Sequence, residues 1–212
     1  MSGLFLSTFH LILLLQVYGD EDRLFNDLLK SYNKFVKPTG LVSASIGLSI
    51  NDIIEFEDDI ITFNVWEERV WNDSRLSWSP EEYNIDTINI PLKEIWSPDI
   101  TIYNKARKEI DLVDALVMIN NDGSLMYVPA KLITVRCTLD GKVYTCNFKY
   151  GSWTYDGFKM DLDIKGDKKV DLSHYSGKYK IIESGAFRHE QHYSCCPEPY
   201  IDVTFKVTIA KN

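Results

Sequence analysis

The chain has 212 residues, an apolar fraction of 45% and a formal net charge of -8. This length suits one globular domain behind a short targeting segment. The acidic balance disfavours nucleic acid and anionic lipid surfaces as partners, and it mildly favours cationic ligands. Twelve Tyr, ten Phe and five Trp make the chain rich in aromatic residues, which suits β-strands and aromatic recognition sites.

The first segment, residues 1–19, is typical of a signal peptide. Its apolar centre covers residues 11–15, and Val17 and Gly19 stand where cleavage favours small residues, although no Lys or Arg precedes them. The apolar run is too short to span a bilayer as a helix, and no other segment approaches that length. We therefore expect a secreted domain at residues 20–212, with no membrane span.

A helix is predicted at residues 21–32, where Leu24, Leu28 and Leu29 share a face and acidic residues stand at the start. After this helix the apolar residues recur with period two, which predicts strands. The predicted strands cover residues 43–50, 60–71, 111–119, 124–128 and 200–209. Residues 120–123 (NNDG) predict a hairpin between two of them. Many short strands between turns predict an all-β, immunoglobulin-like twisted sandwich of about ten strands with a short N-terminal helix.

The predicted strand at residues 60–71 carries a tryptophan on its polar face. Phe63 and Val65 share one face of this strand, whereas Trp66 shares the other with hydrophilic neighbours. A large aromatic residue there is an interface residue, a ligand contact or an isolated exposed side chain. Asn72 follows in an N-glycosylation sequon, Asn-Asp-Ser.

Four cysteines stand in two clusters, Cys137 with Cys146 and Cys195 with Cys196. An even number behind a signal peptide indicates disulfides, and three pairings are possible. The two local bridges require the least rearrangement of the chain, and pairing across the clusters is the alternative. A bridge between neighbouring residues is unusual, because their Cα atoms lie only about 3.8 Å apart.

Metal binding by Cys195 and Cys196 with His189 and His192 is another alternative. Their spacing matches no standard zinc pattern, and an oxidising compartment favours disulfides. Residues 189–192 (HEQH) also differ from a zinc-protease helix, whose histidines are four residues apart. Because the sequence has no Gly-x-Ser-x-Gly elbow and no nucleophile–base–acid set, we expect neither an enzyme nor a cofactor or metal.

Five motifs follow one another along the chain: residues 64–66 (NVW), 71–78 (WNDSRLSW), 96–104 (WSPDITIYN), 151–157 (GSWTYDG) and 193–200 (YSCCPEPY). Together they resemble the extracellular ligand-binding domain of the Cys-loop superfamily of pentameric ligand-gated channels. The likeness is greatest to the soluble acetylcholine-binding proteins and to nicotinic receptor α subunits. It covers residues 28–208, and the order and spacing of the motifs make the match specific.

The resemblance implies a homopentamer with a ligand site at each interface between two copies. One copy would supply the principal face, which a disulfide between neighbouring cysteines caps: Tyr103, Trp153, Tyr193, Cys195, Cys196 and Tyr200. The next copy would supply the complementary face: Trp66, Met118, Met126 and Val128. Any one of these tyrosines, taken alone, would more often be a residue of the sheet core.

Three further residues match supporting positions of the family. The counterparts of Lys149 and Asp202 form a charged cluster with the tyrosine that matches Tyr193, and this cluster rearranges as the loop around the cysteine pair closes. The alternative for Lys149 and Asp202 is an ordinary exposed ion pair, worth under about 1 kcal/mol. Asp99 matches an aspartate that braces the segment at residues 151–157.

The implied ligand is a small organic cation such as acetylcholine or nicotine. A quaternary ammonium ion donates no strong hydrogen bond, so a carboxylate gives it little orientation. The faces of aromatic rings attract it by roughly 0.5–2 kcal/mol each, and four or five rings around one cation give useful affinity. The resemblance therefore implies a secreted pentameric binding protein for acetylcholine and related cations, with a pocket that has drifted to another amine as an alternative.

The main alternative is the extracellular part of a ligand-gated channel subunit. In channels, the segment that corresponds to residues 137–146 is longer and carries an apolar Phe-Pro-Phe-Asp core that meets the membrane domain. Here it is shorter and mostly polar (CTLDGKVYTC), which suits water better than a docking surface. The sequence also ends at Asn212, where a channel subunit would enter its first membrane helix, so we expect a soluble protein.

Overall fold

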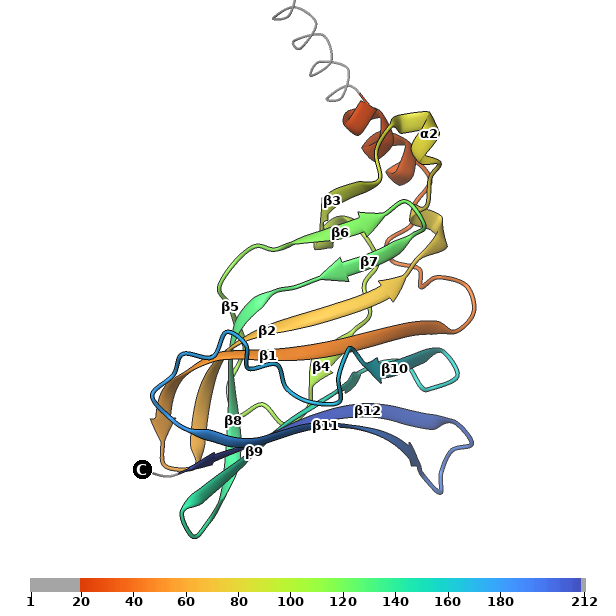
Figure 1. Ribbon diagram of the computed structural model, residues 1–212. Coiled ribbons are helices and arrows are strands. Elements are labelled where there is room, and N and C mark those ends of the chain that lie inside the picture. Colours follow the sequence, from red (N-terminus) through yellow and green to blue (C-terminus); the bar gives the residue numbers. More distant parts are fainter. Residues whose placement is uncertain (1–19, 211–212) are drawn as a thin grey trace, which may run out of the picture.

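Two layers of β-strands enclose the core in the computed structural model, which describes residues 20–210 (Figure 1). The predicted signal peptide at residues 1–19 lies outside the described residues. The strands are β1 (Val42–Glu57), β2 (Ile60–Asn72), β3 (Thr87–Pro91), β4 (Ile100–Ile102), β5 (Ile110–Asp111), β6 (Leu116–Asn120), β7 (Ser124–Tyr127), β8 (Ala130–Asp140), β9 (Val143–Ser152), β10 (Met160–Ile164), β11 (Ile181–His192) and β12 (Pro199–Ala210). The helical segments are residues 20–29, η1 (Ser74–Leu76), α2 (Pro80–Tyr83) and η2 (Leu92–Glu94). The prediction of an all-β sandwich with a short N-terminal helix is confirmed.

The first layer is built on the long antiparallel pair of β1 and β2. β10 extends this layer in parallel beside β1, while β7, β6 and β3 extend it on the far side of β2. The alternation predicted for β2 is confirmed, because Phe63 and Val65 are fully buried and Trp66 is exposed. The layer therefore presents one face to the core and the face that carries Trp66 to the outside.

The second layer consists of β11, β12 and β9, with the short β4 paired to β9. β8 belongs to both layers: residues 130–136 pair with β2, and residues 137–140 pair with β9. Cys137 and Cys146 lie opposite each other at this change of partner, and a disulfide joins them with a Cα–Cα distance of 4.3 Å. The buried bridge therefore fixes the corner where the chain passes from one layer to the other.

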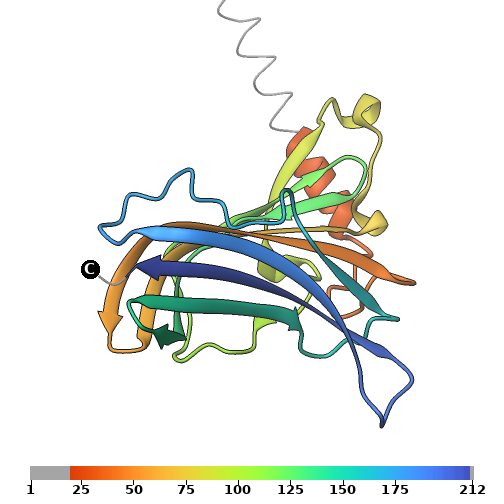
Figure 2. The same ribbon diagram turned by 60° about the horizontal axis from the view of Figure 1, so that its bottom comes forward.

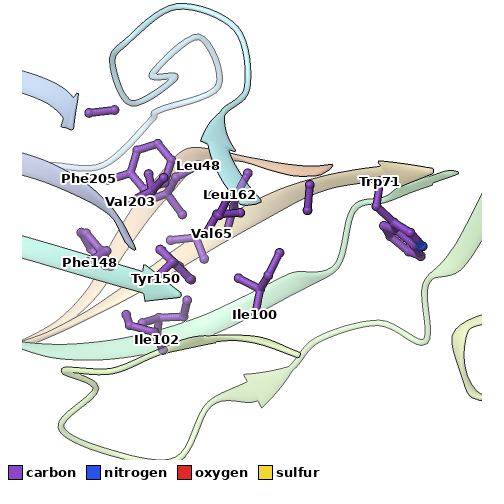
Figure 3. Packing of buried hydrophobic residues seen from close by; sticks show 14 of the residues in the cluster. Leu48, Val65, Trp71, Ile100, Ile102, Phe148, Tyr150, Leu162, Val203 and Phe205 are labelled. Atoms are coloured by element: carbon purple, nitrogen blue, oxygen red, sulfur yellow. The ribbon is translucent and has the colours of Figure 1, made fainter. Parts of the chain in front are cut away.

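Buried apolar side chains of both layers meet in the core, among them Val65 of β2 and Phe148 of β9 (Figure 3). The ring of Phe63 on β2 packs edge-on against Phe148 on β9, with the centroids 5.0 Å apart. Tyr150 on β9 packs edge-on against Phe205 on β12 at 6.0 Å. All four side chains are fully buried. Burial of a large apolar side chain contributes about 1.5–3 kcal/mol, so the Phe63–Phe148 contact helps to hold the layers together and the Tyr150–Phe205 contact helps to hold β9 against β12.

The N-terminal helix covers one end of the first layer, beside α2 (Figure 1). Leu24 on its apolar face is fully buried, as predicted. The prediction extended the helix to Tyr32, but it ends at residue 29 because the last turn tightens. The backbone N–H of Tyr32 donates to the carbonyl of Leu29 at 3.3 Å, and its hydroxyl donates to Asp73 at 2.7 Å. Within residues 20–210, no helix is both long and apolar enough to cross a bilayer.

Two strands differ from the predicted ones. β1 continues to Glu57 rather than ending at Ile50, because register shifts after Ile50 and Ile53 reset the alternation of side chains. The strand predicted at residues 111–119 is interrupted, since residues 112–115 are irregular. The interruption coincides with a change of pairing partner. Before it, β5 pairs with β8, and after it, β6 pairs with β3 and β7.

Candidate functional site

Two aromatic rings meet beside the end of β9. Tyr103 follows β4, Trp153 follows β9, and these two strands pair antiparallel. The Tyr103 side chain lies across Gly151, where a Cβ atom would collide with its ring, and its hydroxyl donates to the carbonyl of Ser152 at 2.5 Å. The ring centroids of Tyr103 and Trp153 are 6.1 Å apart, with an interplanar angle of 61°. The close approach of the two rings therefore requires glycine at position 151.

Asp99 fixes the turn that presents Trp153. Its Oδ1 atom accepts a hydrogen bond from Ser152 Oγ at 2.5 Å, and its Oδ2 atom accepts one from the backbone N–H of Thr154 at 2.7 Å. Ser152 Oγ in turn accepts from the backbone N–H of Tyr155 at 2.7 Å. Because residues on both sides of Trp153 are held in this way, the indole projects outward with 77% of its surface exposed.

The β11–β12 hairpin carries two further tyrosines and extends beyond the body of the sandwich (Figure 2). Tyr193 follows β11 and Tyr200 lies on β12. Their ring centroids are 5.5 Å apart, with an interplanar angle of 67°. Cys195 and Cys196 between them form a disulfide, and the N–H of Cys196 donates to the carbonyl of Tyr193 at 3.2 Å. The end of the hairpin is therefore tied to the start of its own turn.

Both disulfides in the structure are local ones, Cys137 to Cys146 and Cys195 to Cys196, rather than bridges across the two clusters. A cysteine that binds a metal does so as a free thiolate, and these four sulfur atoms are all oxidised. Within residues 20–210, no group of three or more His, Cys, Asp and Glu side chains is arranged to hold a metal ion.

A cavity of about 310 Å³ lies between these segments. Its lining includes four aromatic residues and two charged ones: Tyr103, Trp153, Tyr193, Tyr200, Lys149 and Asp202. The volume is within the range of pockets for small molecules. In the single chain the four rings remain between 37% and 77% exposed, so the cavity is open on one side.

Asp202 lines this cavity and has two basic partners. Its Oδ2 atom lies 3.1 Å from Lys149 Nζ, and its Oδ1 atom lies 2.8 Å from His189 Nδ1. Asp202 is only 5% exposed, and buried charged groups in proteins are generally paired. The sequence suggested His189 only as a metal ligand. Its position opposite Asp202 follows from the register of β11 and β12, which alternation within each strand does not determine.

The hydroxyl of Tyr103 stays protonated in this environment. Burial raises the pKa of Tyr103 to about 12, and the negative charges of Asp202 and Asp99 act in the same direction. The phenol is therefore neutral across the physiological range, so it can donate its proton to Ser152 and offer an uncharged ring to the cavity.

Three of the four residues predicted for the complementary face lie on the outer side of the first layer: Trp66, Met118 and Met126. Met126 on β7 is opposite both Val70 on β2 and Met118 on β6. Directly opposed residues point to the same side of a sheet, so both methionines share the face that carries Trp66. Val128 follows two residues after Met126. In the described part of the chain, none of these four predicted residues lines the cavity beside the hairpin, so one chain keeps the two predicted faces apart.

Sequence reasoning missed an aromatic neighbour of Trp66. The imidazole of His174 lies with its ring centroid 5.2 Å from that of Trp66, at an interplanar angle of 47°. His174 belongs to residues 165–180, the irregular segment between β10 and β11. No periodic pattern runs through this segment, so the sequence carries no signal that places His174 near Trp66.

Known proteins resemble this chain in sequence over most of its length. The model of the neurotransmitter-gated ion-channel ligand binding domain family matches residues 21–212. The chain is 36% identical to an acetylcholine receptor subunit alpha-like protein of Manduca sexta, over 91% of this chain and 42% of the relative. It is 34% identical to the neuronal acetylcholine receptor subunit alpha-3 of Carassius auratus, over 90% of this chain and 40% of the relative. The chain therefore spans about two fifths of the length of these curated relatives.

Among solved structures, the Capitella teleta AChBP in complex with lobeline superimposes on this chain with a TM-score of 0.82. The two chains are 26% identical, and the match covers 91% of this chain and 98% of the other. The likeness therefore extends over nearly the whole sandwich.

Proposed function

This chain belongs to the neurotransmitter-gated ion-channel ligand binding domain family, and on that premise we propose that it is a secreted pentameric protein that binds acetylcholine and related organic cations. One observation carries the proposal: four aromatic side chains from three separate segments converge on a single cavity, Tyr103, Trp153, Tyr193 and Tyr200. The names of the relatives and of the solved structure indicate acetylcholine as the first ligand to test.

The chemistry of the cavity suits a permanently charged ammonium ion. The one carboxylate that we find in its lining, Asp202, is already paired with Lys149 and His189. The free attractive surfaces are ring faces, each of which contributes roughly 0.5–2 kcal/mol to binding a cation, with the higher value reached when water is excluded. The tyrosine hydroxyls add hydrogen-bonding groups at the rim.

A second copy of the chain would exclude that water. The rings of the cavity are too exposed in one chain to enclose a ligand, since Trp153 is 77% exposed. In the proposed ring of five, the outer face with Trp66, Met118, Met126 and Val128 closes the open side of the neighbour's cavity. The exposure of Trp66, at 39%, fits a side chain that is covered only on assembly.

The β8–β9 hairpin supports a soluble binding protein. Its turn, residues 140–142 (DGK), is short, and the side chains of Asp140 and Lys142 are exposed. Gly141 adopts a φ of 59°, which allows the chain to reverse within this short turn. A polar tight turn offers little apolar surface for a membrane domain.

The second candidate is the extracellular part of a channel subunit, which the receptor relatives favour, because the chain matches about two fifths of their length. Expression of the complete transcript in cultured cells would separate the two. Acetylcholine binding in the medium supports the soluble protein, whereas binding that stays with the membranes supports a channel subunit.

We also propose a binding role rather than a catalytic one. Acetylcholine incubated with an excess of the protein should be recovered intact.

The side chain of Asn72 is exposed at the end of β2, so glycosylation there is compatible with the fold and would appear as added mass in protein from a eukaryotic host.

Calorimetric titration of Trp153→Ala with acetylcholine and nicotine tests the cation site. The substitution should weaken binding by at least ~1 kcal/mol, since it removes a large ring face from the cavity. Phe35→Ala is the matched control, because Phe35 is 87% exposed and does not line the cavity. Equal affinities of the wild type and Trp153→Ala would refute the aromatic site.

Native mass spectrometry with and without acetylcholine tests the assembly. A mass of five chains that gains ligand on titration supports the proposal. A monomer that binds acetylcholine would show that no complementary face from a second copy is needed. A monomer that binds no amine would refute the proposed function.

A further inference from the structure

The segment between β10 and β11 is attached to the edge of β1 next to Trp66. The backbone N–H of Asp171 donates to the carbonyl of Leu48 at 2.9 Å, and the N–H of Ile50 donates to the carbonyl of Asp171 at 3.0 Å. Ser49, between these two residues of β1, pairs with Asp171 on one side and with Trp66 on the other. Asp171 and Trp66 therefore lie in one line across β1.

Further contacts fix the turn that follows Asp171. Ser49 Oγ donates to Asp171 Oδ2 at 3.1 Å, and the N–H of Ser173 donates to Asp171 Oδ1 at 2.9 Å. Beyond the turn, the N–H of Ser176 donates to the carbonyl of Asn51 at 3.1 Å. Because both ends of the turn are tied to β1, His174 within it is held beside the ring of Trp66.

We propose that His174 is a ligand-facing residue of the complementary face and that protonation of its imidazole weakens the binding of organic cations. This inference rests on the proposed function. It goes beyond it by assigning a residue to the site and by making cation affinity depend on pH.

His174 lies close enough to Trp66 for its charge to act on a cation bound there. A cation bound to the face of Trp66 lies within about 6 Å of the ring centroid, and the centroid of His174 is 5.2 Å from the same point. A neutral imidazole extends the aromatic surface that the cation meets. A protonated imidazole places a like charge within about a Debye length of the ligand, where repulsion is only partly screened. Histidine changes its charge between about pH 5 and pH 8.

Carboxylates from three elements lie around this turn. Asp171 lies in the same segment, and hydrogen bonds from Ser173 lower its pKa, with His174 acting in the same direction. From β1, Asp52 lies close to Tyr175. From β2, Glu68 forms an ion pair with Lys165. Of these residue types, histidine alone has an unperturbed pKa between about pH 5 and pH 8.

The test compares acetylcholine affinity at pH 7.5 and pH 5.0 in three proteins, by calorimetry on the assembled protein. Acetylcholine carries a permanent charge, so the ligand itself does not titrate. Wild type should bind about fivefold more weakly at pH 5.0, as expected for two like charges about 5 Å apart that water screens fully. His174→Gln should reduce this ratio to less than about twofold. His192→Gln is the matched control: His192 is also an exposed histidine, paired with Glu190 on β11, and its variant should keep the wild-type ratio.

Proton release gives a second measurement that a purely structural role would not change. Titrations at pH 6.5 in two buffers of different ionisation enthalpy should show that acetylcholine binding expels protons from the wild type. His174→Gln should lose most of that release, because cation affinity and protonation are reciprocally linked.

The outcomes separate this inference from the proposed function. If wild type binds acetylcholine at pH 7.5 but shares its pH ratio and its proton release with His174→Gln, the role of His174 is wrong and the cation site stands. If wild type binds no cation at either pH, the proposed function fails and this inference fails with it.

Discussion

The carboxylate of Glu67 is fully buried, and its Oε2 atom lies 3.1 Å from the Nζ atom of Lys131. Arg69 NH2 contacts the same oxygen at 2.5 Å, and Lys131 also pairs with Glu109 at 2.8 Å. These groups lie on the inner side of the same strand segment that carries Trp66 outward. A buried charge is tolerated only when opposite charges and hydrogen bonds compensate its loss of water, so this part of the first layer depends on all members of the cluster.

Replacing Lys131 with Met should destabilise the fold by about 3 kcal/mol, because Glu67 and Glu109 would lose their shared counter-charge in a buried position. Urea unfolding monitored by tryptophan fluorescence measures the change. Lys142→Met is the matched control, since Lys142 is exposed in the β8–β9 turn, and its effect should stay within about 0.5 kcal/mol. A loss in Lys131→Met no larger than in the control would show that the cluster contributes nothing.

The same cluster should make the fold sensitive to acid. Burial raises the pKa of Glu109, but hydrogen bonds from Lys105 and Lys131 outweigh this effect, so the pKa lies below the ordinary value of 4.5. A carboxylate whose pKa is lower in the folded state stabilises the fold above its unfolded pKa, and this contribution is lost as the pH falls through the folded value. Stability should therefore drop below pH 4.5. Glu109→Gln should flatten that part of the stability curve, and an unchanged slope would contradict the assignment.

Substitution of Gly151 by Ala should displace Tyr103 from the cavity. The added methyl group would occupy the position of the tyrosine ring, whose Cζ atom lies 2.6 Å from the ideal Cβ position. Acetylcholine affinity should fall by at least ~1 kcal/mol, because one ring face is lost. Gly47→Ala is the control, since its nearest neighbour, a side-chain atom of Glu68, is at an ordinary 3.6 Å. Unchanged affinity in Gly151→Ala, with a native circular dichroism spectrum, would count against the placement of Tyr103.

Removal of the two disulfides should have different effects: loss of one should lower stability, and loss of the other should alter ligand binding. The Cys137–Cys146 bridge closes a loop with a sequence separation of nine residues, and its removal by double Ser substitution should cost about 2–3 kcal/mol of unfolding free energy. The Cys195–Cys196 bridge joins neighbours, so its removal should change stability by less than about 0.5 kcal/mol.

The Cys195–Cys196 bridge should instead matter for the ligand. Its selective reduction, verified by mass, should slow or weaken acetylcholine binding, because the turn beside Tyr193 becomes looser. Identical association and dissociation rates before and after reduction would show that the bridge does not shape the cavity.

The alternation of side chains was enough to predict the core face of β2 and the outward position of Trp66, because a strand with one buried face fixes the direction of every residue. The same reasoning ended the strand too early in β1, where two register shifts break the period. It also gave no warning of the charged cluster. Glu67 and Arg69 both occupy inward positions among the apolar residues of β2, and Lys131, which pairs with Glu67 and Glu109, comes from a distant part of the sequence.

In the candidate site, too, the sequence predicted some residues and missed another. Tyr103, Trp153, Tyr193 and Tyr200 were predicted from sequence motifs alone, and the structure brings these four side chains to one cavity. Their binding role stays a prediction. His174 was not predicted, because its contact with Trp66 depends on how an irregular segment docks on β1. Such docking is decided by long-range hydrogen bonds, which leave no periodic trace in a sequence.

One chain holds Trp153 beside its cavity and Trp66 on a separate outer face. If the proposed ring forms, loss of either tryptophan spoils one side of a subunit junction and leaves the other side of the same chain usable. Two inactive alleles, one altered at each tryptophan, should then rescue each other when expressed in the same cell, since mixed rings would regain some intact junctions. Intragenic complementation of this kind would be impossible for a pocket contained within a single polypeptide.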